Sequence, residues 1–290
     1  MENETESTRS GLFTYKGFNF ISNVHEEGYV DTLEQFVIRD DDIFVVTYPK
    51  SGTTWMQYIL VLMYHSKDLK EETNKRMMDV VPWFEVKSKV DFNEMPSPRT
   101  FLTHLPTSLV PQGLRHRGKV IYVVRNPKDV AMSYFHFHNI FKLLPDQKNL
   151  DQFLDDFLEG KVFAGSWFAH INDWYNHKDE FNLLFLTFEE MKKDRHGTII
   201  KISNFLGKTL DSKTLDIIVE KSSFENMKKN PTTCFERNFP NHFDSSKGSM
   251  LRKGQVGDWK TVFTMEQNER FDRIYQEKTS KLPLEFIWDL

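Results

Sequence analysis

The sequence predicts an α/β fold, a single domain with a central, mostly parallel sheet covered by helices on both faces. Short β-branched and aromatic runs alternate along the 290 residues with segments of helical spacing, and this alternation is typical of parallel sheets with crossover helices. Hydrophobic residues make up 39% of the chain and include 26 Phe, so they can fill a sizeable core. We expect the polar and acidic residues 1–10 to be a disordered tail and residues 11–290 to form the domain.

The first strand and helix enclose a candidate anion site. Ile43–Tyr48 is short and apolar, as a buried strand is, and Pro49 and Gly52 then break it. Trp55–Tyr64 follows with good helix formers and without internal Gly or Pro. A strand, a tight turn and a helix in this order direct backbone N–H groups and the positive helix end at one point, which favours phosphate or a related anion.

The side chains of this turn support the anion interpretation. Lys50 adds a full charge, and Ser51, Thr53 and Thr54 add hydroxyl donors. The alternative is an ordinary turn whose hydroxyls only cap the helix. The pattern is P-loop-like but differs from the nucleotide P-loop, because the lysine here precedes the only glycine of the turn.

A second predicted strand, Thr100–His104, is stopped by Leu105-Pro106. His104 therefore lies at a strand end, where open α/β sheets place functional groups. A purely structural role for this histidine is equally compatible with the pattern. The sequence makes it a candidate functional residue that depends on its neighbours in space.

The third predicted strand, Lys119–Val124, ends in Arg125, and a helix through Ser133 begins directly after it. Asn126 can cap that helix, and the proline that follows suits its first turn. Arg125 and Ser133 could together hold a second anion. Alternatively, Arg125 pairs with a nearby acid.

The rest of the chain predicts one more buried strand, several helices and one long irregular stretch. The strand is Leu183–Phe188; the helices are Asp151–Leu158, Trp167–Asn176, Ile199–Leu206, Leu215–Val219 and Met265–Thr279; the irregular stretch is Lys229–Asp258. Loops of that length usually serve as lids or binding loops.

Composition excludes several classes of function. The net charge is −4 with a pI of about 6.2, so nucleic acid is not an expected partner. A single cysteine, Cys234, excludes an internal disulfide and suits a reducing compartment. No apolar run is long enough to span a membrane and the first residues lack the core of a signal peptide, so we expect a cytoplasmic protein without a membrane partner. No ligand spacing calls for a metal.

Four places in the chain resemble cytosolic sulfotransferases, in the family's order. They are Tyr48–Trp55 (the phosphosulfate loop), Thr103–Pro106 (the segment with the catalytic base), Val124–Asp129 with Ser133-Tyr134 (the 3′-phosphate site), and Arg252-Lys253-Gly254 through Gly257–Lys260 (the C-terminal signature). The resemblance implies an α/β fold and 3′-phosphoadenosine 5′-phosphosulfate (PAPS) as the sulfuryl donor, with PAP as its product.

The resemblance also implies which residues bind this donor. It places Lys50, Ser51, Gly52, Thr53 and Thr54 around the 5′-phosphosulfate, Trp55 and Phe224 beside the adenine, Phe188 and Ser222 at the nucleotide, and Arg125, Ser133, Arg252, Lys253 and Gly254 around the 3′-phosphate. It also includes Met250 and Leu251 among the donor-binding residues. Some of these depart from the family pattern. Phe188 replaces a usual Tyr, which removes a hydroxyl contact to the adenine, and Ser222 and Met250-Leu251 replace Thr and Phe-Met.

The implied reaction is sulfuryl transfer to a hydroxyl or amine of a small hydrophobic acceptor. His104 is the expected general base, because imidazole titrates near working pH, and Lys50 is expected to stabilise the leaving phosphate. Two other interpretations stay open from the residues alone. One is a small-molecule kinase with a variant phosphate loop, and the other is a nucleotide-binding protein without catalysis.

The resemblance further implies an apolar acceptor site. Its expected residues are Phe18, Phe20, Trp83, Val86, His104, Phe137, Phe141 and Leu144, with His242 in a lid. Such a wall favours flat hydrophobic rings. Glu85 and Asp146 are the only acids adjacent to these positions, and we expect neither to point inward, so a neutral phenol or alcohol is favoured over an amine.

The segment Lys260–Glu269 resembles the family's short dimer motif, with Met265 where valine is usual. It predicts a homodimer. The alternative is a plain junction between a loop and a helix.

Overall fold

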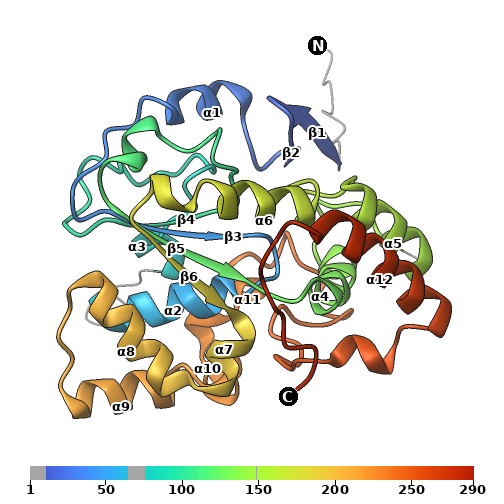
Figure 1. Ribbon diagram of the computed structural model, residues 1–290. Helices are drawn as coiled ribbons and strands as arrows, with labels where there is room; N and C mark the ends of the chain where they lie inside the picture. The colour runs from blue at the N-terminus through green and yellow to red at the C-terminus, as the bar shows by residue number, and fades with distance from the viewer. Residues whose placement is uncertain (1–10, 65–75, 148) are drawn as a thin grey trace.

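The computed structural model describes residues 11–64, 76–147 and 149–290, so the expected tail at 1–10 lies outside the described residues. Its centre is a four-stranded parallel sheet in the order β4-β3-β5-β6 (Figure 1). The strands are β3 (Ile43–Thr47), β4 (Thr100–Thr103), β5 (Lys119–Val124) and β6 (Leu183–Thr187). The predicted α/β fold is confirmed, and every predicted strand is present within one residue of its expected bounds.

The first helix after β3 is α2 (Thr53–Tyr64), which begins two residues earlier than predicted. The others are α1 (Glu27–Leu33), α3 (Met77–Val80), α4 (Pro127–Ile140), α5 (Leu150–Glu159), α6 (Trp167–Asn176), α7 (Phe188–Lys193), α8 (Arg195–Leu206), α9 (Ser212–Lys221), α10 (Phe224–Lys229), α11 (Phe235–Asn238) and α12 (Met265–Thr279). Among the described residues, no helix is long and apolar enough to cross a bilayer.

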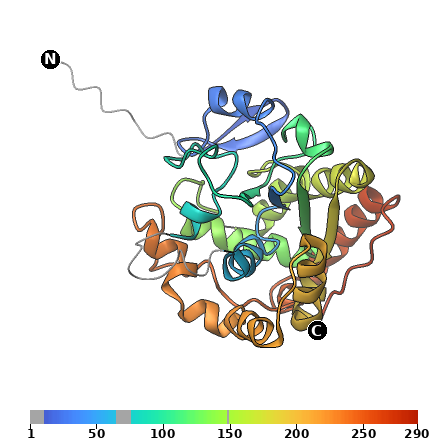
Figure 2. The ribbon, with the colours of Figure 1, turned by 90° about the vertical axis from the view of Figure 1, so that its left-hand side faces the viewer.

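Alternating strand residues build two cores, one on each face of the sheet. Phe44 and Val46 of β3 pack with helices α5, α6 and α12, whereas Ile43 and Val45 pack with α2, α8 and α9. This follows from the period of two in a strand, which sends successive side chains to opposite faces. Figures 1 and 2 show the two helical layers on either side of the strands.

An antiparallel hairpin of β1 (Leu12–Tyr15) and β2 (Phe18–Ile21) lies outside the central sheet. Gly17 sits in its turn at φ +77°, a conformation that favours glycine. The side chains of Phe18 and Phe20 are buried in the core with Phe163 and His25.

The order of the strands fixes where a ligand can bind. The chain leaves β3 for β4 on one side and returns to β5 on the other, so connections diverge at the carboxyl end of β3. Such a switch point opens a crevice beyond the strand ends. The turn after β3, His104 after β4 and Arg125 after β5 all follow strands that end at this edge.

Candidate functional site

A cavity of about 520 Å³ occupies this crevice, and residues from both ends of the chain line it. At one end it is lined by the turn after β3, the start of α2 and residues 250–255; at the other it is lined by aromatic and aliphatic side chains. His104 lies among the lining residues. The cavity therefore has a basic end and an apolar end.

The turn after β3 is shaped by two unusual backbone conformations. Lys50 has φ +71° and Gly52 has φ +112°, and a Cβ at Gly52 would lie 3.1 Å from the ring of Phe188. The first turn of α2 leaves backbone N–H groups without partners inside the helix, and Thr53 and Thr54 line the cavity there. The turn is thus a close-fitting anion cradle.

Three buried donors near this cradle, one of them Trp55 Nε1, lack a hydrogen-bond partner among the described residues. Ser51 is fully buried and its Oγ has no hydrogen-bond partner among the described residues, and the same is true of Arg125 Nε. Buried polar groups are normally hydrogen-bonded. Orphaned donors beside a basic cavity fit an anionic ligand that supplies the missing acceptors.

Lys50 extends over the ring of Phe137, with 4.3 Å between Nζ and the ring centroid. Burial lowers the pKa of Lys50 to about 7, and repulsion from Arg125 and Arg252 acts in the same direction. A phosphate or sulfate beside Nζ would raise the pKa of Lys50 again, because a nearby negative charge favours the protonated amine. Lys50 is therefore held where an anion would restore its charge.

Arg125 lies at the carboxyl end of β5, and only 8% of it is exposed. Its guanidinium covers the ring of Phe188 at 4.3 Å, donates to the carbonyl of Gln255 at 2.7 Å, and lies 3.7 Å from Asp129. Arg125 thus pairs with an acid, as one interpretation of the sequence has it, and it also lines the cavity with Ser133, where the other interpretation expects an anion.

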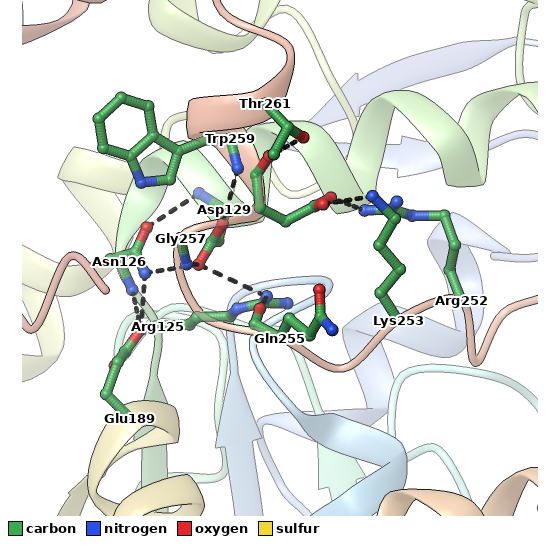
Figure 3. Close-up of polar contacts among 11 residues, drawn as sticks. Arg125, Asn126, Asp129, Glu189, Arg252, Lys253, Gln255, Gly257, Trp259 and Thr261 are labelled. Atoms are coloured by element: carbon green, nitrogen blue, oxygen red, sulfur yellow. Dashed lines mark hydrogen bonds and ion pairs between the residues drawn. The ribbon is translucent and has the colours of Figure 1, made fainter. Parts of the chain in front are cut away.

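Asp129 ties the C-terminal loop to the start of α4 (Figure 3). Its carboxylate accepts the backbone N–H of Gly257 at 2.8 Å and of Trp259 at 3.2 Å. Asn126 caps the helix through the Asp129 N–H and also donates to Asp129 and Glu189, each at 2.9 Å. A single buried carboxylate therefore fixes the loop that carries the basic pair.

That basic pair, Arg252 and Lys253, shares the carboxylate of Asp258 (Figure 3). The Lys253 Nζ lies 2.5 Å from Asp258 Oδ1, and Arg252 donates to Oδ2. The two cations lower the pKa of Asp258. Gly254 follows at φ +59° and packs so closely on Phe224 that a Cβ would overlap the ring.

Aromatic side chains line the cavity near the anion cradle. Trp55 and Phe188 meet edge to face at 5.2 Å between ring centroids, and Phe224 and Ser222 line the same part of the cavity wall. Met250 and Leu251 also line it. Every residue expected at the donor lines the cavity except Ser51, which is fully buried between the lining residues Lys50 and Gly52 of the same turn.

His104 is buried, with 3% exposed, and its ring is held in one orientation. Nδ1 lies 2.6 Å from the carbonyl oxygen of Thr47, which can only accept, so Nδ1 carries the proton. Nε2 then keeps its lone pair on the cavity side. Burial lowers the pKa of His104 to about 3, so the imidazole is neutral at physiological pH. This differs from the expected titration near working pH, because a buried ring is harder to protonate than an exposed one.

The apolar end contains five of the expected acceptor residues, namely Trp83, Val86, Phe137, Phe141 and His242, in addition to His104. Three predicted positions are wrong, because Phe18, Phe20 and Leu144 are buried in the core and do not line the cavity. Ile21, Asn23, Val24 and Leu143 line it instead. The hairpin presents its end to the cavity and its phenylalanines to the core.

Neither acid adjacent to the predicted wall lines the cavity. Glu85 is fully buried, accepts the His104 backbone N–H at 2.8 Å, and has a pKa raised by burial to about 7. Asp146 is paired with Lys247 at 2.9 Å. Glu26 is the carboxylate at the apolar end, and it is paired with Lys87 at 3.0 Å.

The sequence interpretation missed two cations at the donor end. Lys192 of α7 and Arg195 of α8 line the cavity, and burial lowers the pKa of each. They follow β6, the strand at the edge of the sheet. A basic residue in the first turns after each parallel strand is the signal that could have found them.

The signature of the sulfotransferase domain family matches residues 40–283. The chain belongs to the sulfotransferase family. Of the three interpretations left open by the residues, the match supports the sulfotransferase and neither the kinase nor the non-catalytic nucleotide-binding protein. The chain is a PAPS-dependent sulfotransferase with small-molecule acceptors. The orphaned donors, the two close-packed glycines and the cations described above fit such a donor.

Known sulfotransferases align with nearly the whole chain. Rabbit (Oryctolagus cuniculus) amine sulfotransferase is 46% identical over 98% of this chain and 96% of its own length. Human (Homo sapiens) sulfotransferase 2A1 is 41% identical over 88% of this chain and 90% of its own. A mouse sulfotransferase crystallised in complex with PAP superposes with a TM-score of 0.79, at 34% identity over 93% of this chain and 95% of that structure.

Proposed function

We propose that this sulfotransferase acts on a hydroxyl of a small, neutral, hydrophobic acceptor, with His104 as general base and Lys50 stabilising the leaving phosphate. The observation that carries the proposal is the hydrogen bond from His104 Nδ1 to the Thr47 carbonyl at 2.6 Å. It leaves the Nε2 lone pair free to take the acceptor proton. The residue whose carbonyl sets this tautomer is the last of β3, directly before the donor turn.

Charge compensation at the donor end supports the role of Lys50. Sulfuryl transfer moves negative charge onto the bridging oxygen of the leaving phosphate, much as phosphoryl transfer does. The proposal is supported by Lys50 and the first residues of α2, which line the same cavity beside the turn after β3. Fixed donors aimed at developing charge typically contribute 10²–10³-fold to turnover.

The same arrangement supports the assignment of the remaining donor residues. We assign the 5′-phosphosulfate to the turn from Lys50 to Thr54, and the 3′-phosphate to Arg125, Ser133 and the Arg252–Gly254 loop. The nucleobase is assigned to the part of the cavity wall formed by the rings of Trp55, Phe188 and Phe224. Each assignment rests on a shared cavity wall and on charge or ring complementarity.

A neutral acceptor is favoured by the charges at the apolar end. A bound ammonium would need an unpaired carboxylate, and Glu26 is engaged by Lys87. His104 is neutral and cannot serve as the counter-charge. A phenol or alcohol satisfies this wall, and its one polar group can reach Nε2.

An aromatic amine is the second candidate, and the 46% identity to an amine sulfotransferase favours it. Aromatic amines are largely unprotonated at neutral pH, so such a molecule would fit the same uncharged wall. Aliphatic ammonium acceptors fit less well.

The test is incubation with labelled donor and matched phenols, steroid alcohols and aromatic amines, with products read by mass. We expect the label on a phenol or alcohol, and we expect His104→Ala to lose about a hundredfold or more in turnover while still binding PAP. Turnover of His104→Ala near wild type would remove the base assignment. A preference for the amine over a phenol of the same shape would overturn the acceptor choice.

We also propose that residues 11–290 act as one domain in the cytoplasm and that the chain forms a homodimer through Lys260–Glu269. In that segment Met265 is 78% exposed and Val262 is 43% exposed, which is unusual for apolar side chains and fits a small interface. Met265→Glu should shift a dimer to monomer mass in sedimentation. A monomer at micromolar concentration in the wild type would contradict it.

A further inference from the structure

Three side chains of helix α6 form hydrogen bonds to the segment His104–Thr107, which carries the proposed base. His170 Nε2 donates to the His104 carbonyl at 3.0 Å, and Trp174 Nε1 donates to the Leu105 carbonyl at 3.1 Å. Asp173 accepts the N–H and the hydroxyl of Thr107 at 2.7 and 2.8 Å. Positions 170, 173 and 174 are spaced i, i+3 and i+4, so they share one face of the helix.

The backbone of the segment His104–Thr107 needs hydrogen-bond partners from other elements, because this segment lies beyond the end of β4. β4 ends at Thr103, and the residues from His104 to Thr107 are buried or nearly so without belonging to a helix or strand. Backbone carbonyls that are buried without a hydrogen bond cost about 1–3 kcal/mol each. The side chains of α6 therefore supply what the sheet would supply to a strand.

The hydrogen bonds also define which nitrogen of His170 carries its proton. Nε2 must be the donor, because a carbonyl only accepts. Nδ1 is then the acceptor of a hydrogen bond that the Tyr122 hydroxyl donates at 2.9 Å. Tyr122 is fully buried in β5, with its ring stacked on His170 at 5.7 Å between centroids. This continuous chain links the central sheet to the base.

We propose that α6 is the positioning element for the catalytic base, with His170 as its central positioning residue and Tyr122 fixing the His170 tautomer. The inference rests on the proposed role of His104. Three contacts converge on that residue: His170 holds its carbonyl, Glu85 its N–H, and the Thr47 carbonyl its ring. Loss of the His170 contact frees the backbone about which the ring must be aimed.

This positioning has a signature in the pH profile of the reaction. The titratable groups facing His104 are Lys50 from the donor turn, His25 beside the hairpin, His170 from α6, and Glu85 at its backbone N–H. Desolvation is the largest cause of its low pKa. When the segment loosens and water reaches the ring, the pKa of His104 moves back toward about 6.5.

The test compares His170→Phe and Tyr122→Phe with His138→Phe, a matched control. His138 is similarly buried and lies in α4, with Nδ1 3.2 Å from the Pro145 carbonyl and its ring beside Tyr134 and Phe153. We expect His170→Phe to lower kcat by about tenfold or more, as a misplaced base does, with PAP affinity unchanged. Tyr122→Phe should have a smaller effect of the same kind, and His170→Gln, whose amide can still donate, should recover part of the activity.

The pH profile separates positioning from a loss of stability. In the wild type, kcat/KM should show no loss from His104 as pH falls from 7.5 to 6, because the base stays neutral. In His170→Phe it should fall as pH is lowered through about 6.5. An unchanged profile, or equal losses in His138→Phe with equal shifts in Tm, would overturn the proposal. If His104→Ala itself kept full turnover, the base assignment would fail, whereas the contacts of α6 could still be scored by Tm.

Discussion

The two ends of the cavity are built in different ways. The donor end consists of backbone turns and charged side chains directly after parallel strands, and short stretches of sequence specify each part. The acceptor end consists of aromatic and aliphatic side chains from the hairpin, α4 and the segments around 83, 163 and 242. Charge and backbone direction can be inferred from a local pattern, whereas an apolar wall is defined only by the packing of distant segments.

The largest expected effect tests the donor end. Lys50→Met should lower kcat roughly 10²–10³-fold, because it removes a fixed charge at the leaving oxygen. Lys192→Met is the matched control, since that lysine lines the same end from α7. It should weaken donor binding with a smaller effect on kcat. Equal losses of kcat in the two variants would show a diffuse basic field in place of an aimed one.

The acceptor side carries buried neutral histidines, which should make stability depend on pH. Burial lowers the pKa of His25 to about 4, from about 6.5 in the unfolded chain. The unfolded state therefore binds more protons between these values, and stability is lost as pH falls from about 6.5 to 4. Each such histidine contributes up to about 3 kcal/mol of this loss. Urea unfolding at several pH values should show a free energy of unfolding that falls steeply below pH 6.5 in the wild type and less steeply in His25→Phe. The same dependence on pH in both proteins would contradict this.

A glycine pair compares the donor loop with the hairpin. Gly254→Ala places a Cβ into the ring of Phe224, so PAP affinity should fall tenfold or more, about 1.4 kcal/mol. Gly17→Ala has a similar positive φ but meets no atom within 4 Å. It should cost about 1 kcal/mol of stability and leave affinity unchanged. Calorimetric titration measures the PAP affinity of each variant, and urea unfolding measures its stability. Equal PAP affinities in the two variants would contradict the close packing of Gly254 on Phe224.

The smallest expected effect compares the proposed acceptor wall with expected acceptor residues that lie in the core. Phe141→Leu should raise the acceptor KM several-fold through about 1 kcal/mol of lost apolar contact, with the donor KM unchanged. Phe18→Leu should lower Tm without changing either KM, because that ring lies in the core. A change of acceptor KM in Phe18→Leu would return the hairpin phenylalanines to the wall.

The sequence predicted the strands well, and it predicted donor residues that the structure brings to one cavity wall, because each of these depends on neighbours along the chain. Ile43–Thr47, Gly52 and Arg125 follow from strand ends and turn chemistry. Phe18 and Phe20 were misplaced because a hairpin has two faces, and composition does not say which one meets the cavity. The grip of α6 on His104 was also beyond reach, since 66 residues separate His170 from the carbonyl it holds.

The peptide unit after Thr47 has a consequence for redesign. Its carbonyl orients the base, and the chain continues at once into the donor turn. Only Tyr48 and Pro49 separate this carbonyl from Lys50, so the proposed base and the proposed donor turn are linked through a short stretch of backbone. No such linkage reaches the hairpin end, Leu143 or His242. Engineers could exchange those segments to obtain new acceptors while the reactive pair keeps its alignment.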